Sequence, residues 1–316
     1  MKHVIVVMGC MLVLVGCKAE RDPVSFFGPD ASGILVVDAL LIVDKPLPDL
    51  FIRETLNAAS VYRREDAGVI DAEVAITQGG ETFVYRADPD SAGRYLPPPN
   101  AALVLPQTMY TLSVRSQGRE ASAVTITPQR LDIRDAVLLD ETSFEVIRVF
   151  KQYEDGLDVV FTAPENQVPY QTGLLEAQFE PLPVRGYHIS IESLDPNSDI
   201  VVDSDLLEDD DYDDLDRYGS SPAFEAKDGN LRLPWFAVFY EGRHVIRIYA
   251  IDENWFDLIR SVPEFFQEEE DSAIQPGSLA GDNFERPLFR VDGGIGIFGS
   301  ASMDSMGFVV LPREAR

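Results

Sequence analysis

Apolar and polar residues alternate in short segments along most of this chain, and this alternation constrains the fold more than any other feature. In the segment MYTLSVRS (residues 109–116), Tyr110, Leu112 and Val114 occupy every second position, which places their side chains on one face of a β-strand. The 21 prolines and 22 glycines separate such segments, as turns between strands require. The sequence therefore predicts an all-β protein, mainly β with one or two short helices.

Residues 33–128 are predicted to form an N-terminal domain. Its strand candidates are ILVVDALLIV (34–43), VIDAEVAIT (69–77), TFVYRA (82–87), MYTLSVRS (109–116) and REASAVTITP (119–128). Alternation in the second of these is expected to place four side chains on one face: Ile70, Ala72, Val74 and Ile76. The segments QGGE (78–81) and QG (117–118) predict hairpin turns. Short, regularly spaced strands without a helical stretch are typical of an Ig-like or transthyretin-like β-sandwich.

Residues 129–316 are predicted to form a second β-rich domain. Its strand candidates are SFEVIRVF (143–150), LDVVFTA (157–163), YHISIESL (187–194), LPWFAVFY (233–240), HVIRIYAI (244–251) and GFVVLP (307–312). A helix is expected from Glu253, because Trp255, Leu258 and Ile259 follow at helical spacing before Pro263. The acid-rich segment DSDLLEDDDYDDLD (203–216) is predicted to be an exposed loop.

The first residues indicate a processed targeting segment. Lys2 and His3 precede an apolar run over residues 4–16, which is shorter than the roughly 20 residues of a membrane-spanning helix. The run ends in LVGC, which resembles a bacterial lipobox, so we expect a signal peptide over residues 1–16, lipidation of Cys17 and a tether over residues 17–32. An ordinary signal peptide that contains a cysteine is the alternative. Cys10 is a poorer second candidate for lipidation, because cleavage there would leave an apolar stub.

Cysteine content and charge narrow the chemistry. Both cysteines, Cys10 and Cys17, lie in the targeting segment, so the mature chain is predicted to have no disulfide and no cysteine metal site. The formal net charge is −28, which makes nucleic acid an unfavourable partner because its phosphates would be repelled. Adaptation to salt is an alternative reason for so acidic a composition.

The segment DGGIGIFGSAS (292–302) contains the spacing of a dinucleotide-binding fingerprint at Gly294, Gly296 and Gly299. That fingerprint requires a helix after the glycines, whose N-terminus holds the pyrophosphate. Ile295, Ile297 and Phe298 instead favour a strand. We therefore predict a strand of the second domain, in which the glycines permit close approach of another backbone, and no nucleotide and no cofactor.

Metal and catalytic motifs find little support. Asp209, Asp211 and Asp213 begin with EF-hand spacing, but Asp214 stands where glycine is needed and Ser220 where glutamate is needed. A looser calcium site and a solvated acidic loop both remain open, and the acidic run at 268–271 is interpreted in the same way. His188 and His244 lie in strand patterns, and neither a G-x-S-x-G nor an H-E-x-x-H motif occurs. The sequence predicts no catalytic residue, no metal ligand and no enzymatic activity.

The lipobox-like segment and the strand pattern together resemble a Bacteroidota lipoprotein family, domain of unknown function 4249 (DUF4249). The matching segments are ILVVDALLIVDKPLPDLFIRETLNAASVY, VIDAEVAIT, AGRYLPP, MYTLSVRSQGREASAVTITP and GGIGIFGSAS. The long acidic loop departs from the family pattern. The resemblance implies an outer-membrane lipoprotein often encoded beside TonB-dependent transporters, and the only site residue it carries over is the lipidated Cys17.

The leading hypothesis is therefore a non-enzymatic accessory or binding partner of a TonB-dependent nutrient transport system, anchored in the outer membrane by Cys17. A calcium-dependent adhesion or scaffold module is one alternative, suggested by the acidic loop. A surface hydrolase acting on glycans or peptides is another. The sequence leaves open the ligand, the oligomeric state and the membrane face on which the protein lies.

Overall fold

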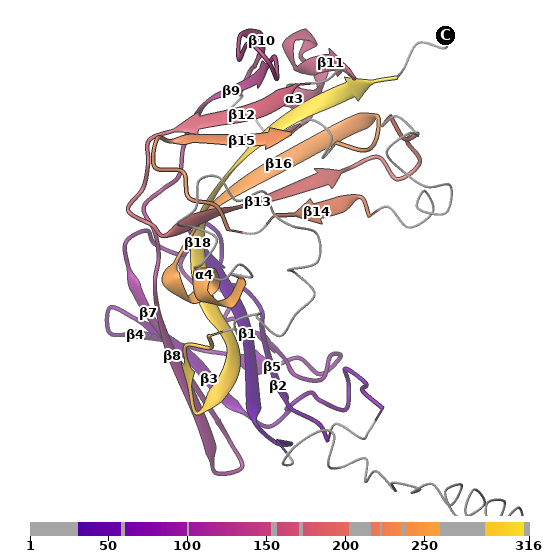
Figure 1. Cartoon of the computed structure of the whole chain (residues 1–316). Helices are drawn as coiled ribbons and strands as arrows, with labels where there is room; N and C mark the ends of the chain where they lie inside the picture. The colour runs from indigo at the N-terminus through magenta and orange to yellow at the C-terminus, as the bar shows by residue number, and fades with distance from the viewer. Residues whose placement is uncertain are drawn as a thin grey trace, which may run out of the picture.

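The structure is a computed structural model. It describes residues 31–57, 61–99, 101–152, 157–170, 173–201, 216–221, 223–234, 238–259 and 288–312. Most of these residues lie in β-strands, and the helices among them are short, so the all-β prediction is confirmed. Figure 1 shows two lobes, one toward each end of the long strand β18 (Gly294–Leu311). We call them the N-lobe, which holds residues 31–128, and the C-lobe, which holds residues 129–251.

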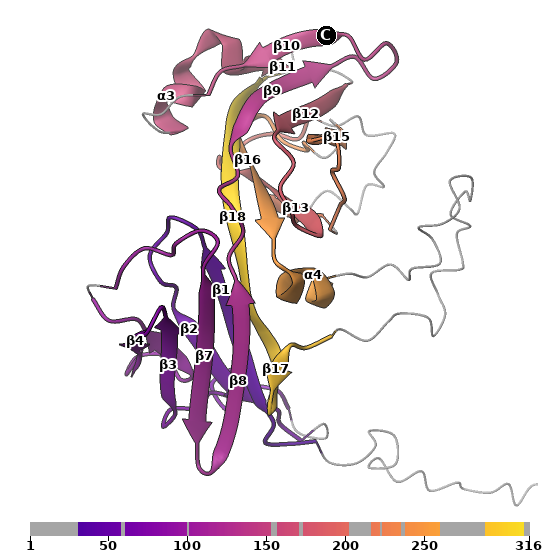
Figure 2. The same cartoon turned by 90° about the vertical axis from the view of Figure 1, so that its left-hand side faces the viewer.

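Strand β18 joins the two lobes. Its first half pairs in parallel with β1 (Leu35–Ile42) of the N-lobe, and its second half pairs antiparallel with β16 (Gly242–Ile251) of the C-lobe. One nine-stranded sheet therefore extends through both lobes, in the order β14-β13-β16-β18-β1-β2-β6-β5, with β11 paired to β18 beside this path. Figure 2 shows β18 continuous between the lobes.

The N-lobe is a β-sandwich. The N-lobe part of the long sheet faces a five-stranded sheet of order β17-β8-β7-β3-β4. Alternation explains the packing, because every second residue of each strand enters the space between the sheets, as Leu112 and Val114 do from one side and Val37 and Ile52 from the other. Burying each such side chain contributes about 1.5–3 kcal/mol. The remaining strands of this lobe are β2 (Leu50–Glu54), β3 (Glu73–Gln78), β4 (Glu81–Val84), β5 (Arg86–Ala87), β6 (Arg94–Leu96), β7 (Met109–Ser116), β8 (Arg119–Ile126) and β17 (Val291–Asp292).

The C-lobe packs a four-stranded sheet of order β10-β9-β12-β15 against the other end of the long sheet. Its core joins Leu138 and Ala177 of the small sheet to Ile189, Ile248 and Phe308 of the long sheet. The elements of this lobe are β9 (Ile133–Leu139), β10 (Val146–Phe150), α3 (Leu157–Thr162), the 3₁₀ helix η1 (Pro164–Asn166), β11 (Gln167–Pro169), β12 (Leu174–Phe179), β13 (Gly186–Ser193), β14 (Tyr218–Ser220), β15 (Asn230–Pro234) and β16.

Helix α4 (Glu253–Ile259) lies where the lobes meet, beside β18 (Figures 1 and 2). The helix was expected from the spacing of Trp255, Leu258 and Ile259, and it begins at Glu253 as predicted. The Asp252 carboxylate caps it by accepting a hydrogen bond from the backbone nitrogen of Trp255 at 2.9 Å. The predicted end of the helix at Pro263 falls outside the described residues.

The apolar core of the N-lobe also includes residues from near the end of the chain. Val291 and Phe298 pack with the N-lobe strands, because β17 pairs with β8 and the first half of β18 pairs with β1. The strand predicted around the glycines is therefore present, but the prediction that it belongs to the second domain is wrong for its first half. The apolar pattern alone does not reveal which strand lies beside it.

Several strand predictions are confirmed with shifted ends, and β3 is the clearest shift. The strand predicted over residues 69–77 begins at Glu73. Val74 faces the core as predicted, whereas Ile70 is 68% exposed. Val69 is buried instead, and its carbonyl accepts a hydrogen bond from the hydroxyl of Tyr95 at 2.9 Å. The regular alternation therefore does not extend back through residues 69–72.

One strand prediction in the C-lobe is wrong, and another is matched only at its start. Residues 157–162 form helix α3, in which Val160 and Phe161 are both buried. Adjacent buried positions suit one side of a short helix rather than the alternating faces of a strand. The strand predicted over residues 233–240 shares its first two residues with β15 (Asn230–Pro234), which pairs with β12, and residues 235–237 lie outside the described residues. Residues 143–150, 187–194, 244–251 and 307–312 contain or overlap β10, β13, β16 and the end of β18, as predicted.

Candidate functional site

The glycine-rich segment is explained by strand packing. Gly296 has a φ of +101°, and a Cβ there would lie 2.0 Å from the backbone oxygen of Val37 on β1. A Cβ on Gly294 would lie 2.8 Å from the backbone oxygen of Leu35. The strand continues to Leu311 without a helix, so the strand–turn–helix geometry that places a pyrophosphate is not formed. These glycines allow β1 and β18 to approach closely.

Most of the other predicted site residues lie outside the described part of the chain. Cys17 is among them, as are the acidic residues 268–271. Of the acidic segment 203–216, only Asp216 is described. Within the described residues, no group of three or more His, Cys, Asp or Glu side chains is placed to hold a metal ion.

The two histidines lie in strands as expected, on opposite faces of the long sheet. His188 pairs across the sheet with Tyr249, and His244 lies an odd number of residues from Tyr249 on β16. His188 contacts the rings of Tyr249 and Trp255, with centroid distances of 5.8 and 5.5 Å. His244 stacks on Phe308 on the other face, at 5.4 Å between ring centroids. Burial lowers the pKa of both imidazoles, that of His244 to about 4.

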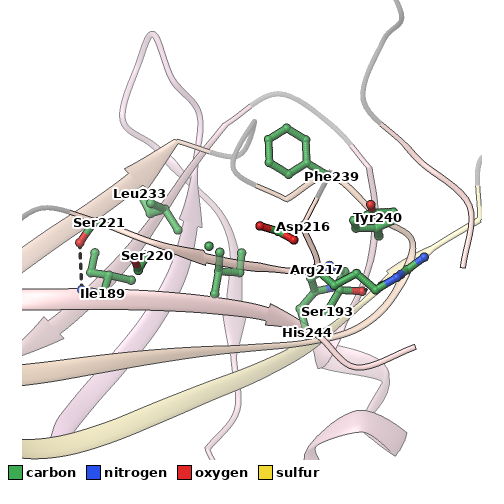
Figure 3. Close-up of a pocket in the computed structure, with 12 residues that line it drawn as sticks. Ile189, Ser193, Asp216, Arg217, Ser220, Ser221, Leu233, Phe239, Tyr240 and His244 are labelled. Carbon is green, nitrogen blue, oxygen red and sulfur yellow. Dashed lines mark hydrogen bonds between the residues drawn. The ribbon is translucent and has the colours of Figure 1, made fainter. Parts of the chain in front are cut away.

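A pocket of about 200 Å³ opens between the two sheets of the C-lobe, on the face that carries His244 (Figure 3). We call it the C-lobe pocket. Its walls are mainly apolar and come from Ile189, Ile191, Leu233, Phe239 and Tyr240. The isoleucines belong to β13 and Leu233 belongs to β15, so the space lies between facing strands of the lobe.

The charged side chains of the C-lobe pocket lie toward one end. Figure 3 shows Arg217 near Tyr240 at one end of the pocket, whereas Leu233 lies at the other end beside Ser220 and Ser221. The guanidinium of Arg217 lies 3.9 Å from the ring centroid of Tyr240. One of its terminal nitrogens donates to the carbonyl of Asp195 at 2.6 Å, and the other donates to the carbonyl of Ser198 at 3.1 Å. These contacts hold Arg217 in one position.

His244 lines the same pocket and carries an unpaired nitrogen. Its Nδ1 lies 3.0 Å from the carbonyl of Gly242, whereas its Nε2 has no hydrogen-bond partner among the described residues. Because a carbonyl oxygen only accepts, Nδ1 must carry the proton, and neutral His244 presents Nε2 as an acceptor. The low pKa keeps the ring in this neutral form at neutral pH.

A second and larger hollow of about 770 Å³ lies where the lobes meet, and we call it the junction groove. It is bordered by residues 124–129, by residues 183–185, by the start of α4 and by Arg290. Arg185 and Arg290 both pair with Asp257, whose side chain is almost fully buried. Exposed Val124 and Ile126 add an apolar surface on β8.

Buried hydrogen bonds fix the floor of the junction groove. The hydroxyl of Thr125 on β8 donates to the carboxylate of Asp252 at 2.6 Å and lies 2.7 Å from the hydroxyl of Ser300 on β18. Asn254 donates from its side-chain nitrogen to the carbonyls of Val124 and Phe298, both at 2.7 Å. Burial raises the pKa of Asp252. The groove is therefore formed on a cross-linked junction of β8, β18 and α4.

Comparison with protein families identifies one match. The family model described as "Domain of unknown function (DUF4249)" matches residues 21–306, which is most of the chain. The chain belongs to the DUF4249 family. A search of curated proteins found no significant match. Among the described residues of this DUF4249 protein, no helix is long and apolar enough to cross a membrane.

Sequence reasoning named His244 only as an ordinary strand histidine, and it singled out none of the arginines that border the two hollows of this DUF4249 protein. Arg217 immediately follows the acidic segment and carries no motif. Arg185 and Arg290 are distant in sequence and meet only through Asp257. The one available signal was the placement of His244 in a mainly apolar strand, which also fits an ordinary buried histidine.

Proposed function

We propose that this protein is a non-enzymatic, lipid-anchored accessory of a TonB-dependent transport system at the outer membrane. The LVGC segment supports the anchor, because a cysteine after small residues and an apolar run suits lipidation at Cys17. Two acyl chains or more hold a protein stably at a membrane. The family match begins at residue 21, just beyond this segment, and supports a folded region that starts on the C-terminal side of the anchor.

The observation that carries the accessory role is the composition of the junction groove. Met109 and Ile126 lie directly opposite each other on β7 and β8, and Val124 is nearby on the same outer face. All three are exposed, and Val124 and Ile126 line the junction groove together with Arg185 and Arg290. Apolar side chains beside arginines are typical of surfaces that bind other proteins. We assign this surface to a segment of the transport partner.

The hydrogen bonds beneath the groove support the same role. Thr125, Asp252 and Ser300 link β8, α4 and β18 under the exposed apolar residues, so the surface is held in one shape before a partner arrives. A preorganised surface loses less conformational entropy on binding, which favours affinity. The groove is therefore suited to contact a partner without first rearranging.

The test is affinity purification of the tagged full-length chain from detergent-solubilised outer membranes. The wild-type protein should bring down a TonB-dependent receptor as its main partner. Ile126→Glu places a charge in the junction groove and should reduce the recovered receptor by at least about tenfold, which corresponds to about 1.4 kcal/mol. Cys17→Ala should release the protein from the membrane fraction.

The matched control is Val84→Glu. Val84 is 63% exposed and Ile126 is 61% exposed, and both lie in the five-stranded sheet, but Val84 is on the edge strand β4, away from the groove. The control should retain the receptor. Recovery of the wild-type protein alone would overturn the accessory role. Equal recovery with both variants would instead show that the partner binds elsewhere.

A further inference from the structure

The most exposed apolar side chains of the described residues lie close together in the sequence. Among the large apolar side chains that the structure describes, Val61, Ile70 and Tyr62 have the three highest exposed fractions, 81%, 68% and 66%. All three belong to residues 61–70, which we call the apolar loop. Single exposed apolar residues are common on soluble proteins, whereas several in one short segment indicate a surface that a partner or a membrane covers.

The apolar loop is attached to the end of the N-lobe at which the described chain begins. The backbone nitrogen of Glu54, the last residue of β2, donates to the carbonyl of Ala67 in the apolar loop at 2.8 Å. The carbonyl of the next residue, Thr55, accepts from the backbone nitrogen of Gly33 at 2.7 Å, and its hydroxyl donates to the carbonyl of Ala31. The end of β2 therefore joins the apolar loop to the first described residues, and we call this end of the N-lobe the tether end.

The turn between β7 and β8 closes the same end of the lobe. Asp71, which follows Ile70, accepts a hydrogen bond from the hydroxyl of Ser116 at 2.9 Å. Arg119, on the other side of the turn, donates to the carbonyl of Gly33 at 2.7 Å. Figure 2 shows this turn at the end of the N-lobe farthest from the C-lobe. Ile70 therefore lies at the tether end, as the start of the apolar loop does.

The tether end is the part of the fold nearest to the proposed lipid anchor. Strand β1 begins at Leu35 and runs parallel to the first half of β18, whose second half continues into the C-lobe. The 18 residues of β18 extend over about 55 Å. The chain from Cys17 to residue 31 spans at most about 50 Å when fully extended. A membrane beyond the far end of the C-lobe is therefore out of reach of a lipid on Cys17.

The residues of the apolar loop suit the surface of a lipid bilayer. Tyr62 combines an apolar ring with a polar hydroxyl, and tyrosine is enriched where hydrocarbon meets the headgroups. Arg63 and Arg64 follow it, and long arginine side chains lay their methylene groups along apolar surface while the charge stays in water. Glu65 and Asp66 balance these two charges. We therefore expect apolar contact, rather than attraction to anionic lipid, to hold this loop at a membrane.

We propose that the apolar loop rests on the lipid surface that holds Cys17, with Val61, Tyr62 and Ile70 inserted among the headgroups. This inference rests on the proposed lipid anchor and adds the orientation of the folded chain to it. The C-lobe then points away from the membrane. The junction groove stands clear of the lipid, because an interfacial contact of this kind reaches only about 5–10 Å into the bilayer.

The experiment places one fluorescent probe on the lipidated protein in vesicles. Beyond Cys17 the chain has no cysteine, so Tyr62→Cys provides a single thiol for an environment-sensitive dye. Ile70→Cys provides a second position in the same loop, and both native side chains are exposed, so the dye does not enter the core. The vesicles consist of phosphatidylcholine with a fraction of brominated phosphatidylcholine, which quenches the dye from within the bilayer. Iodide quenches it from the water on both sides.

The matched control is Ile126→Cys, because Ile126 is 61% exposed and Tyr62 is 66% exposed. Strand β8 runs from Arg119 at the tether end to Ile126, a length of about 23 Å, which exceeds the depth of an interfacial contact. Brominated lipid should quench the dye at positions 62 and 70 and leave it unquenched at position 126. Quenching by iodide should be about tenfold weaker at position 62 than at position 126, since an ion enters lipid poorly.

The outcomes separate the lipid contact from the anchor. Wild-type protein that does not float with the vesicles would contradict the anchor at Cys17, and the lipid contact would fall with it. If the labelled protein floats but iodide reaches positions 62 and 70 as readily as position 126, the anchor stands and only the lipid contact is overturned. Protection from iodide without quenching by brominated lipid would show that a second copy of the chain covers the loop, which also overturns the proposal.

Discussion

Replacing Gly296 by alanine should destabilise the protein far more than the same change at Gly80. Both glycines have a positive φ, +101° at Gly296 and +91° at Gly80. A Cβ at Gly296 would lie 2.0 Å from the backbone oxygen of Val37, whereas a Cβ at Gly80 would meet nothing within 4 Å. The pair therefore separates the cost of the backbone conformation from the cost of the strand contact.

The expected difference follows from these contacts. Alanine in the left-handed region costs about 1–2 kcal/mol, and this applies to both variants. At Gly296, the backbone oxygen of Val37 must also move by about 1 Å, because real Cβ atoms essentially never lie closer than 3.0 Å to a neighbouring atom. That shift weakens the pairing of β1 with β18, and losing about two hydrogen bonds adds roughly 2 kcal/mol. We expect a loss of about 1–2 kcal/mol for G80A and about 3–4 kcal/mol for G296A.

Urea denaturation followed by far-UV circular dichroism measures both losses. Hydrogen exchange of the β1 amides supplies a local readout, because the two lobes need not unfold in one step. Gly294→Ala serves if G296A is insoluble, since a Cβ there would lie 2.8 Å from the backbone oxygen of Leu35 without a positive φ. The reasoning is refuted if G296A is no less stable than G80A while Gly294→Ala matches the wild type.

Three further predictions concern buried charge. Removing both Arg185 and Arg290 should lower the free energy of unfolding in urea by about 3–5 kcal/mol, because buried Asp257 then has neither ion-pair partner. Asp257→Ala should lower it by only about 1–2 kcal/mol, because the half-exposed arginines regain water. Equal losses would contradict this reasoning. Burial lowers the pKa of His244 from 6.5 to about 4, so as the pH falls the unfolded chain binds a proton before the folded chain does. Roughly 3 kcal/mol of stability should therefore be lost between pH 6.5 and 4. The variant H244F should lack this loss when denaturation is measured across that pH range. Asp252→Ala should cost about 1–2 kcal/mol by removing the cap of α4, and Asp252→Asn should restore most of it in thermal unfolding.

The sequence predicted the strands that have one buried and one exposed face. β7 was located at both ends, because Tyr110, Leu112 and Val114 alternate with exposed residues over its whole length. Strand β9 was missed, because its last four residues, Ala136 to Leu139, are all buried and therefore show no alternation. Helix α3 was mistaken for a strand, since a short apolar run with β-branched residues favours either structure until its packing is known.

The two hollows were less predictable than the strands, because each depends on residues that are distant in the chain. Cys17 could be proposed as a lipidation site from local pattern alone, because the resemblance to a lipobox rests on four adjacent residues. The unpaired nitrogen of His244 could not, because it requires knowing that Nδ1 is bonded to Gly242 and that nothing among the described residues reaches Nε2. The partners of Asp257 likewise become visible only in the folded chain.

The continuous strand β18 connects the cores of the two lobes. Phe298 packs in the N-lobe core and Phe308 in the C-lobe core, so the same strand is fixed at both ends. Two lobes joined only by a flexible linker would be expected to move relative to each other. Here a paired strand crosses the junction, and Ser300 within it is hydrogen-bonded to Thr125 of β8. The junction groove therefore lies on a strand that the cores of both lobes hold in place, so the proposed partner would meet a surface whose geometry is already set.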